Sequence, residues 1–246
     1  MTARRALLLP AVVAGAAFLI LIGLGTWQLE RLRWKEGVIA TVEARAAQPP
    51  APLPDPATWS ALTREADEYR RVRLSGRFDH ARETLVYMVR GDDEPGLKGP
   101  GFLVITPLIR PDGPPVLVNR GFVPQDRRDP ASRSAGQVTG PVTVTGLIRM
   151  PEEASMFVPA NDPARNAFYR RDPAGIAAAR GLDGAAPFIV DAEAGEVPGG
   201  LPQGGATRLR FPNRHLEYAM TWYGLAATLA GVCIALLWAR RRPRAG

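Results

Sequence analysis

The sequence predicts two transmembrane helices that flank a mainly β (α+β) extracytoplasmic domain. Two observations carry this prediction. Residues 6–29 and residues 218–239 are apolar runs without a charged side chain, and each can cross a hydrocarbon core of about 30 Å, which takes about 20 residues. Between them, from Tyr69 onward, short runs rich in β-branched residues alternate with Gly, Pro and Asp clusters, a pattern typical of strands and turns.

The net charge of +7 is concentrated beside the two apolar runs. Lys and Arg next to a span are retained in the cytoplasm. We therefore expect a protein of the cell (inner) membrane with both termini in the cytoplasm, although Arg31, Arg33 and Lys35 after the first run oppose this orientation. The rest of the chain carries only about +1, so nucleic acid is not an expected partner. The flanking charges are those of Arg4, Arg5, Arg240, Arg241, Arg242 and Arg244.

The first apolar run could be a retained anchor or a cleaved signal peptide. It is longer than the apolar core of about 7–15 residues in a signal peptide, and no small-residue cleavage site ends it. We expect an anchor at 6–29 that continues as a juxtamembrane helix to about Ala47. The stretch "QPPAPLPDP" then breaks the helix and forms an extended connector, because proline cannot continue a helix. The helix and connector occupy residues 30–65.

The exported domain is expected at residues 66–212, before the span at 218–239 and a basic cytoplasmic tail at 240–246. "PDGPP" predicts a hairpin turn between two of its strands. "DPAGIAAARGL" predicts a short helix with Asp172 as N-cap, Pro173 at the first position and Gly181 as C-cap. Strands are predicted in "YRRVRLSGRF", "TLVYMVR", "GFLVITPLIR", "PVLVNRGFVP", "PVTVTGLIRM" and "PFIVDA". Their order in a sheet cannot be read from these patterns.

The sequence offers little enzyme chemistry, and we expect no catalytic site. It has no G-x-S-x-G nucleophile motif. The one cysteine, Cys233, lies in the second apolar run and cannot form an intramolecular disulfide or a Cys-based metal site in the domain. With only two histidines, a zinc site of the usual kind is not expected. His80, between two predicted strands, is interpreted as a solvated loop residue.

His215 lies at the edge of the second apolar run, in "NRHLEYAMTW". Helical spacing places Tyr218 and Trp222 on the same face as His215. Tyr and Trp are typical of an interfacial belt, so one interpretation is a membrane anchor. Ionisable groups at such a position tend to mark function, however, and a neutral imidazole can bind a haem iron axially. Both interpretations stay open on the residues alone.

Two further groups are candidates for binding a partner. Asn119 and Arg120 end an apolar strand in "VNRGFVP", before a glycine that permits a bulge or a close approach. Arg120 could instead pair with a carboxylate of its own domain. At the end of the first run Trp27 fits an aromatic belt, while Gln28 and Arg31 lie on a helix face that could reach lipid phosphates or a partner.

Four stretches resemble the Surfeit-locus family of cytochrome c oxidase assembly factors. They are "GLGTWQLERLRWK", "YRRVRLSGRFD", "VNRGFVP" and "NRHLEYAMTWYGLA", and they occur in the order of that family. The resemblance covers nearly the whole chain. Phe122 stands where the family commonly has Trp, which is a mild departure.

The resemblance implies a non-enzymatic factor that assists insertion of haem a into the largest subunit of cytochrome c oxidase. His215 matches the axial ligand of a transient, non-covalent haem a, with Trp222 near the haem and Tyr218 beside it. Expected partners are the largest oxidase subunit, haem a synthase as a possible donor, and membrane lipid. The alternative is a membrane scaffold that stabilises oxidase assembly intermediates and does not bind haem.

Overall fold

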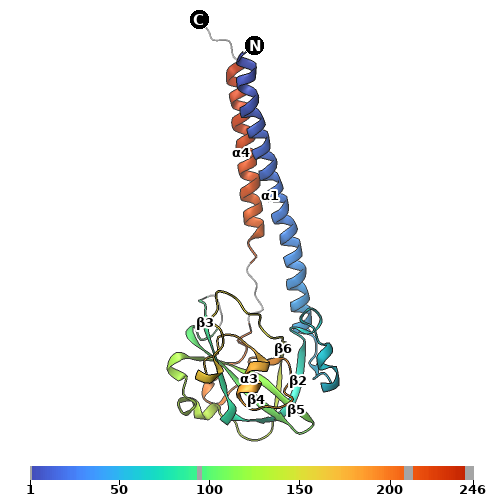
Figure 1. Cartoon of the computed structure of the whole chain (residues 1–246), viewed down its shortest axis with the longest axis vertical. Coiled ribbons are helices and arrows are strands. Elements are labelled where there is room, and N and C mark those ends of the chain that lie inside the picture. The colour runs from blue at the N-terminus through green and yellow to red at the C-terminus, as the bar shows by residue number, and fades with distance from the viewer. Residues whose placement is uncertain (1, 93–95, 208–212, 242–246) are drawn as a thin grey trace. The chain divides into compact units, whose positions relative to one another are not determined.

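The computed structural model describes residues 2–92, 96–207 and 213–241 (Figure 1). The chain divides into two compact units. One comprises Met1–Thr41 with Arg210–Gly246, and the other is Val42–Leu209. Residues 208–212 at the end of the predicted domain, and 242–246 in the predicted tail, lie outside the described ranges.

Two long helices form the first unit. Helix α1 (Thr2–Ala47) runs without interruption for 46 residues, or about 70 Å at a rise of about 1.5 Å per residue. The predicted span and juxtamembrane helix are thus one helix, and it ends at Ala47 as predicted. Helix α4 (His215–Arg241) begins at the histidine of interest. Both helices are long and apolar enough to cross a membrane.

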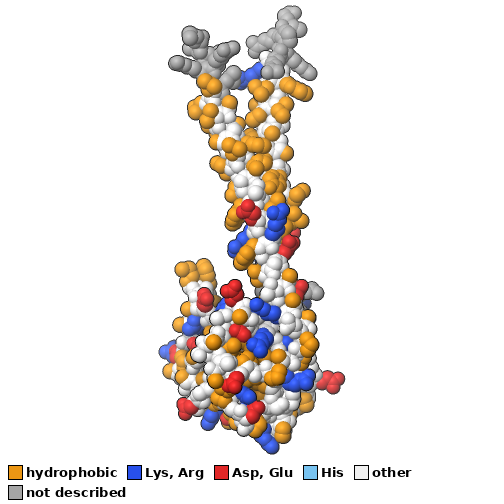
Figure 2. Space-filling view, turned by 90° about the vertical axis from the view of Figure 1, so that its right-hand side faces the viewer, with side chains coloured by type: hydrophobic (Ala, Val, Ile, Leu, Met, Phe, Trp, Pro, Cys, Tyr) orange, Lys and Arg blue, Asp and Glu red, His pale blue; other side chains and the backbone are white. Residues whose placement is uncertain are grey.

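Helices α1 and α4 pack together through small residues. Gly25 of α1 is buried, as are Ala219 and Ala226 of α4, which lie two turns apart on one face. The larger apolar side chains, such as Leu19 and Leu236, remain exposed. Figure 2 shows hydrophobic side chains along much of both helices. Small residues at the contact and large apolar residues outside are typical of paired membrane helices.

The second unit contains a mixed seven-stranded sheet in the order β1-β2-β6-β7-β5-β4-β3. The pairs β1–β2 and β5–β7 are parallel and the other pairs are antiparallel. Because β2 also pairs with β4, strands β2, β6, β7, β5 and β4 close into a small barrel. The strands are β1 (Ala51–Pro52), β2 (Arg71–Phe78), β3 (Thr84–Arg90), β4 (Gly99–Arg110), β5 (Gly113–Pro124), β6 (Val142–Arg149) and β7 (Ile189–Ala192). Each predicted strand is present.

The second unit also contains short helices, including α2 (Arg64–Asp67) and α3 (Pro173–Ala179). Helix α3 begins as predicted, since the Asp172 carboxylate accepts a hydrogen bond from the backbone N–H of Gly175. Its end differs by one residue from the prediction. Arg180 is the C-cap, and Gly181 follows it with a φ of 60°, the left-handed conformation in which glycine ends many helices.

The core has two clusters on opposite faces of the sheet. Val118 contributes to the cluster inside the barrel, whereas Leu117 contributes to the cluster beneath α3. Neighbouring residues of a strand point to opposite faces, so β5 is covered on both sides. This double burial explains why its sequence is a continuous apolar run rather than an alternating one.

The proline-rich connector takes part in the packed domain. Strand β1 within it pairs with the start of β2. Trp59 follows in a 3-10 helix (Pro56–Ala61), where its ring packs edge-on against Phe188 at 5.6 Å in the barrel core. The Trp59 indole N–H donates to the carbonyl of Pro54 at 3.0 Å. The core therefore extends into residues 48–65, which the sequence suggests are an extended linker.

Candidate functional site

His215 is held by a hydrogen bond across the helix pair. Its Nδ1 lies 2.7 Å from Oε1 of Gln28 on α1. A carboxamide oxygen only accepts, so Nδ1 carries the proton and Nε2 of the neutral ring keeps its lone pair. Nε2 has no hydrogen-bond partner within the described ranges, and His215 is half-buried. The arrangement leaves one imidazole nitrogen oriented and able to bind a metal.

A second polar contact lies beside the first. The hydroxyls of Thr26 and Tyr223 are 3.1 Å apart, in hydrogen-bond contact between α1 and α4. Gly25 lets the Tyr223 ring approach, because a Cβ at this position would lie 2.7 Å from the ring. The segment from Gly25 to Gln28 thus supplies both the space and the polar partners that fix the start of α4.

The predicted aromatic residues do not all belong to this contact. Tyr218 is 55% exposed, and Trp27 is similarly exposed. Trp222 is half-buried. Helical spacing alone therefore selected Tyr218, whereas the aromatic hydroxyl that contacts α1 is that of Tyr223, which the sequence reasoning missed.

Gln28 and Arg31 were both predicted to face a partner. Gln28 contacts His215 of its own chain. The Arg31 guanidinium instead stacks over the ring of Trp34, 4.1 Å from its centre. Such a cation–π contact at an exposed site stabilises by about 0.5–1 kcal/mol. It orients Arg31 on the surface of α1 and leaves this residue available to an external group.

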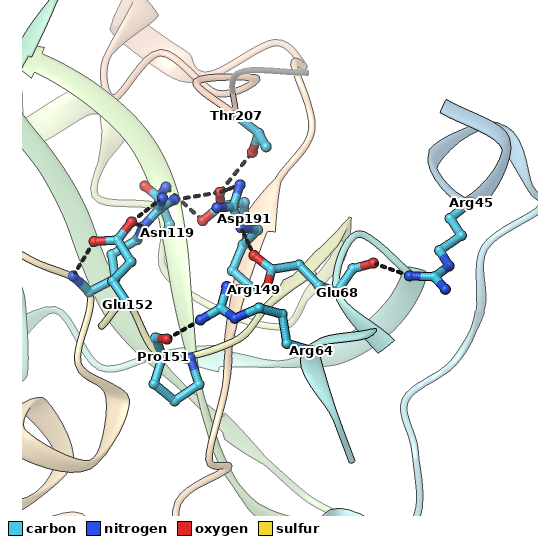
Figure 3. A network of polar contacts seen from close by, with 10 residues as sticks. Arg45, Arg64, Glu68, Asn119, Arg149, Pro151, Glu152, Asp191 and Thr207 are labelled. Atoms are coloured by element: carbon cyan, nitrogen blue, oxygen red, sulfur yellow. Dashed lines mark hydrogen bonds and ion pairs between the residues drawn. The ribbon is translucent and has the colours of Figure 1, made fainter. Parts of the chain in front are cut away.

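Asn119 lies inside a network of buried polar groups (Figure 3). Its side-chain N–H donates to Asp191 at 2.9 Å, and its oxygen accepts from the backbone N–H of Gly121 at 3.1 Å. Asp191 also accepts from Thr207 at 2.7 Å and from Arg171 at 2.9 Å. Asn119 is only 2% exposed, so it has no surface to offer a partner.

The network continues from Asp191 to both ends of the domain. Arg149 forms an ion pair with Glu68 at 3.1 Å and reaches Asp191 at 4.0 Å. The Glu68 carbonyl accepts from Arg45, near the end of α1, at 3.4 Å. On the other side is Thr207, the last described residue before the segment that leads to α4. One set of contacts therefore joins the entry and exit of the domain.

Charge is balanced within this network. Arg171 binds the carboxylates of both Asp191 and Glu152. Burial opposes its positive charge, but the two carboxylates outweigh burial and raise the pKa of Arg171. A buried charge is tolerated when it is paired and hydrogen-bonded in this way.

Arg120 points to the opposite face of β5 from Asn119 and is 7% exposed. Its guanidinium contacts Gln137 and Nδ1 of His80, each at 3.3 Å, donates to the Gly136 carbonyl, and stacks over Phe78 at 4.8 Å. Among the described residues, the hydrogen-bond partners of Arg120 include no carboxylate, so the alternative of an ion pair within its own domain is not found there. Burial lowers its pKa to about 10, which leaves it charged at neutral pH.

His80 is not the solvated loop residue that we expected. It is half-buried at the start of a short 3-10 helix (His80–Arg82). Its Nε2 donates to the Val138 carbonyl at 2.8 Å, and Nδ1 then accepts from Arg120. Within the described residues, no group of three or more His, Cys, Asp or Glu is placed to hold a metal ion.

The family model described as "SURF1 family" matches residues 15–227. This range includes all of the domain, most of α1 and the first half of α4. The chain is 43% identical to Surfeit locus protein 1 of Homo sapiens over 218 residues, which cover 83% of this chain and 70% of the relative. This chain belongs to the SURF1 family.

Other SURF1 relatives align over similar lengths. Surfeit locus protein 1 of Takifugu rubripes is 41% identical over 229 residues, covering 85% of this chain and 91% of the relative. The SURF1-like protein of Drosophila melanogaster is 35% identical over 242 residues, covering 91% and 76%. The resemblance that the sequence motifs indicated is confirmed. Gln28, His215 and Tyr223 all lie within the residues that the SURF1 family model matches.

Proposed function

We propose that this SURF1 family protein is a non-enzymatic assembly factor for cytochrome c oxidase. In this proposal it binds haem a transiently and assists its insertion into the largest oxidase subunit, with haem a synthase as a possible donor. The observation that carries the proposal is the state of His215. Its Nδ1 is engaged by Gln28 and its Nε2 is free among the described residues.

The residues at this site fit a haem. Neutral imidazole is a common axial ligand of haem iron, and its second nitrogen usually donates to an oriented acceptor. His215 would bind through Nε2, Gln28 would hold the imidazole ring, and Trp222 and Tyr218 would contact the haem. Haem a, when bound, would supply an iron that accepts the Nε2 lone pair.

A single histidine suits a carrier better than two would. A cofactor that must pass to the oxidase has to be held with moderate affinity. A site with one protein ligand would release the haem more readily than a site with two. Tyr218 and Trp27 are more than half exposed, so this part of the helix pair is accessible from outside.

In the same proposal α1 and α4 cross the cell (inner) membrane, with both termini in the cytoplasm and the β domain outside. The lengths and apolar surfaces of both helices support the crossing, and the arginines that flank them support the orientation. His215 would then lie near the outer interface. Labelling of a cysteine introduced at Asp112, in a Cys233→Ser background, by a membrane-impermeant reagent on intact cells tests the orientation. Absence of labelling until the cells are broken would contradict it.

The first experiment is the visible absorption spectrum of the protein purified in detergent from cells that make haem a. We expect a haem a band that is lost or shifted in His215→Ala. His80→Ala serves as the matched control, since it removes the other histidine of the chain, in the β domain, and leaves His215 unchanged. An unmodified protein without haem, or an identical spectrum in His215→Ala, would contradict the ligand assignment.

One observation favours the scaffold alternative. Met156 and Phe157 are 90% and 87% exposed at the tip of a loop in the β domain. Two adjacent large apolar side chains in such a position offer a contact for another protein. If the protein is a scaffold, Met156→Ser with Phe157→Ser lowers the yield of assembled oxidase and His215→Ala does not. The opposite pattern supports haem delivery.

A further inference from the structure

We infer that Gln28 is the positioning residue of the His215 site: it selects the ring tautomer and thereby determines which nitrogen can bind a metal. The tautomer itself follows from the contact between α1 and α4. Its consequence for haem a rests on the proposed function. Gln28 thus has a role inside the protein, in place of the contact with a partner that its position on the helix suggested.

The donors and acceptors of the two side chains determine the position of the proton. A neutral imidazole has one N–H, and Gln28 presents Oε1 to Nδ1 at 2.7 Å. Because a carboxamide oxygen cannot donate, the proton is on Nδ1. In water, a neutral histidine exchanges its proton between the two nitrogens, so a fixed acceptor is needed to keep Nε2 unprotonated.

The position of Gln28 is itself fixed by the packing of the two helices. Gln28 is half-buried, one helical turn from the buried Gly25. Gly25 accommodates the Tyr223 ring, and Thr26 contacts the Tyr223 hydroxyl at 3.1 Å. The carboxamide of Gln28 therefore projects from a segment that cannot turn freely about the helix axis without breaking these contacts.

The same contact has an energetic consequence for metal binding. A hydrogen bond from the non-ligating N–H raises the basicity of the ligating nitrogen and fixes the plane of the ring. Loss of such a partner typically lowers metal affinity by about 10- to 100-fold. The site thus depends on both helices: α4 supplies the ligand and α1 supplies the group that orients it.

His80 provides an internal reference for a direct test. The chain has only two histidines. His80 donates from Nε2 to the Val138 carbonyl and accepts at Nδ1 from Arg120, so it holds the opposite tautomer. Solid-state NMR of the full-length, haem-free protein in lipid bilayers, with 15N-labelled histidine, would therefore give two distinguishable rings. His80→Gln assigns them. The spectra are recorded at about pH 8, above the range in which histidine titrates in water.

In the unmodified protein we expect the His215 proton on Nδ1. In Gln28→Leu that nitrogen should lose the proton in part or in full. In Gln28→Glu, which keeps an acceptor, the proton should stay on Nδ1. Glu30→Gln, on the exposed side of α1, is the control and leaves the signals unchanged. A proton on Nε2 in the unmodified protein overturns the inference, as does a Gln28→Leu spectrum identical to it. Should Gln28→Leu fail to fold, the unmodified protein and Gln28→Glu decide the question.

Binding of haem a is a second measurement, which distinguishes failure of the positioning role of Gln28 from failure of the proposed function. In protein loaded with haem a, Gln28→Leu should lower the affinity about 10- to 100-fold and shift the absorption band, whereas Gln28→Glu retains binding. If His215 has the expected tautomer and no haem a binds, the proposed function fails and the role of Gln28 in positioning His215 stands. If haem a binds with equal affinity to Gln28→Leu, the positioning role is overturned and the proposed function stands.

Discussion

The side-chain amide of Asn119 donates to the carboxylate of Asp191 across the parallel pair of β5 and β7, at 2.9 Å. The two residues are 72 positions apart in the sequence and directly opposite in the sheet register. Through Asp191, this bond connects the middle of the barrel to the segment that leaves the domain. It makes the motif "VNRGFVP" a structural element of the β domain.

The first prediction concerns Asn119. Asn119→Ala should lower the free energy of unfolding by about 1–3 kcal/mol, because it removes a donor to a buried carboxylate and leaves the Gly121 N–H unpaired. Denaturation followed by near-ultraviolet circular dichroism measures the change. Ser75→Ala, which removes an exposed hydrogen bond to Thr143, is the control and should change little. Equal effects of the two substitutions would contradict the role given to Asn119.

The second prediction concerns Arg120 and pH. Burial lowers the pKa of Arg120 to about 10 in the folded protein, below its value in the unfolded chain. The cost of burying the charge is therefore present at neutral pH and begins to be relieved only as pH approaches 10. We expect the difference in unfolding free energy between the unmodified protein and Arg120→Met to be constant from about pH 6 to 8.

Above about pH 9 the unmodified protein should gain stability relative to Arg120→Met, since its folded form can release the proton more readily than its unfolded form. Urea titrations across this range provide the measurement. A difference that already changes between pH 6 and 7 would contradict the assignment of the effect to Arg120. Arg71→Met, which removes an ion pair with Glu193 near the surface, is the comparison.

The third prediction concerns Gly121. Its φ is 131°, and a Cβ there would lie 2.1 Å from the carbonyl oxygen of Gln203. Gly121→Ala should destabilise the domain by more than about 1 kcal/mol through strain and collision. Gly140→Ala provides the matched control, because Gly140 also has a positive φ of 95° but no atom within 4 Å of a Cβ. If both substitutions cost the same, backbone conformation and not the approach of Gln203 sets the requirement.

The fourth prediction concerns the packing of α1 on α4. Gly25→Val should push Tyr223 away and weaken the contact between Gln28 and His215, because its side chain would occupy the position of the ring. We expect a changed His215 nitrogen signal and a loss of bound haem a. Gly23→Val is the matched control, since a Cβ at Gly23 meets nothing within 4 Å. An unchanged His215 signal in Gly25→Val would show that the two contacts are independent.

Local sequence patterns predicted most of the helices and strands, but few of the contacts between them. Turn residues and β-branched runs located strands β2 to β7 but not β1, and the prolines ended α1 at Ala47. The closure of the barrel between β2 and β4 could not be predicted, because Arg77 and Ile109 pair through the curvature of the whole sheet. Trp59 likewise has no local signal for burial, since its partner Phe188 is far away in sequence.

The candidate site was predicted in part for a related reason. The position of His215 at the start of an apolar helix could be read from one segment. Its contact with Gln28 depends on how α1 and α4 pack, and each helix alone has several faces that would serve. Helical spacing from His215 selects Tyr218, but burial of Ala219 and Ala226 identifies the face that meets α1, and Tyr223 lies beside it. The buried partners of Asn119 and Arg120 were also beyond local reasoning.

The polar network of the domain has a mechanical consequence. Arg45 and Thr207 are near the two points at which chain leaves the domain, and Asp191, Arg149 and Glu68 connect them. A force applied between these two points would be carried first by this short path of side chains. The barrel strands would be shielded until the path yields. Pulled at its two ends, the domain should therefore show an early yield before its sheet unravels.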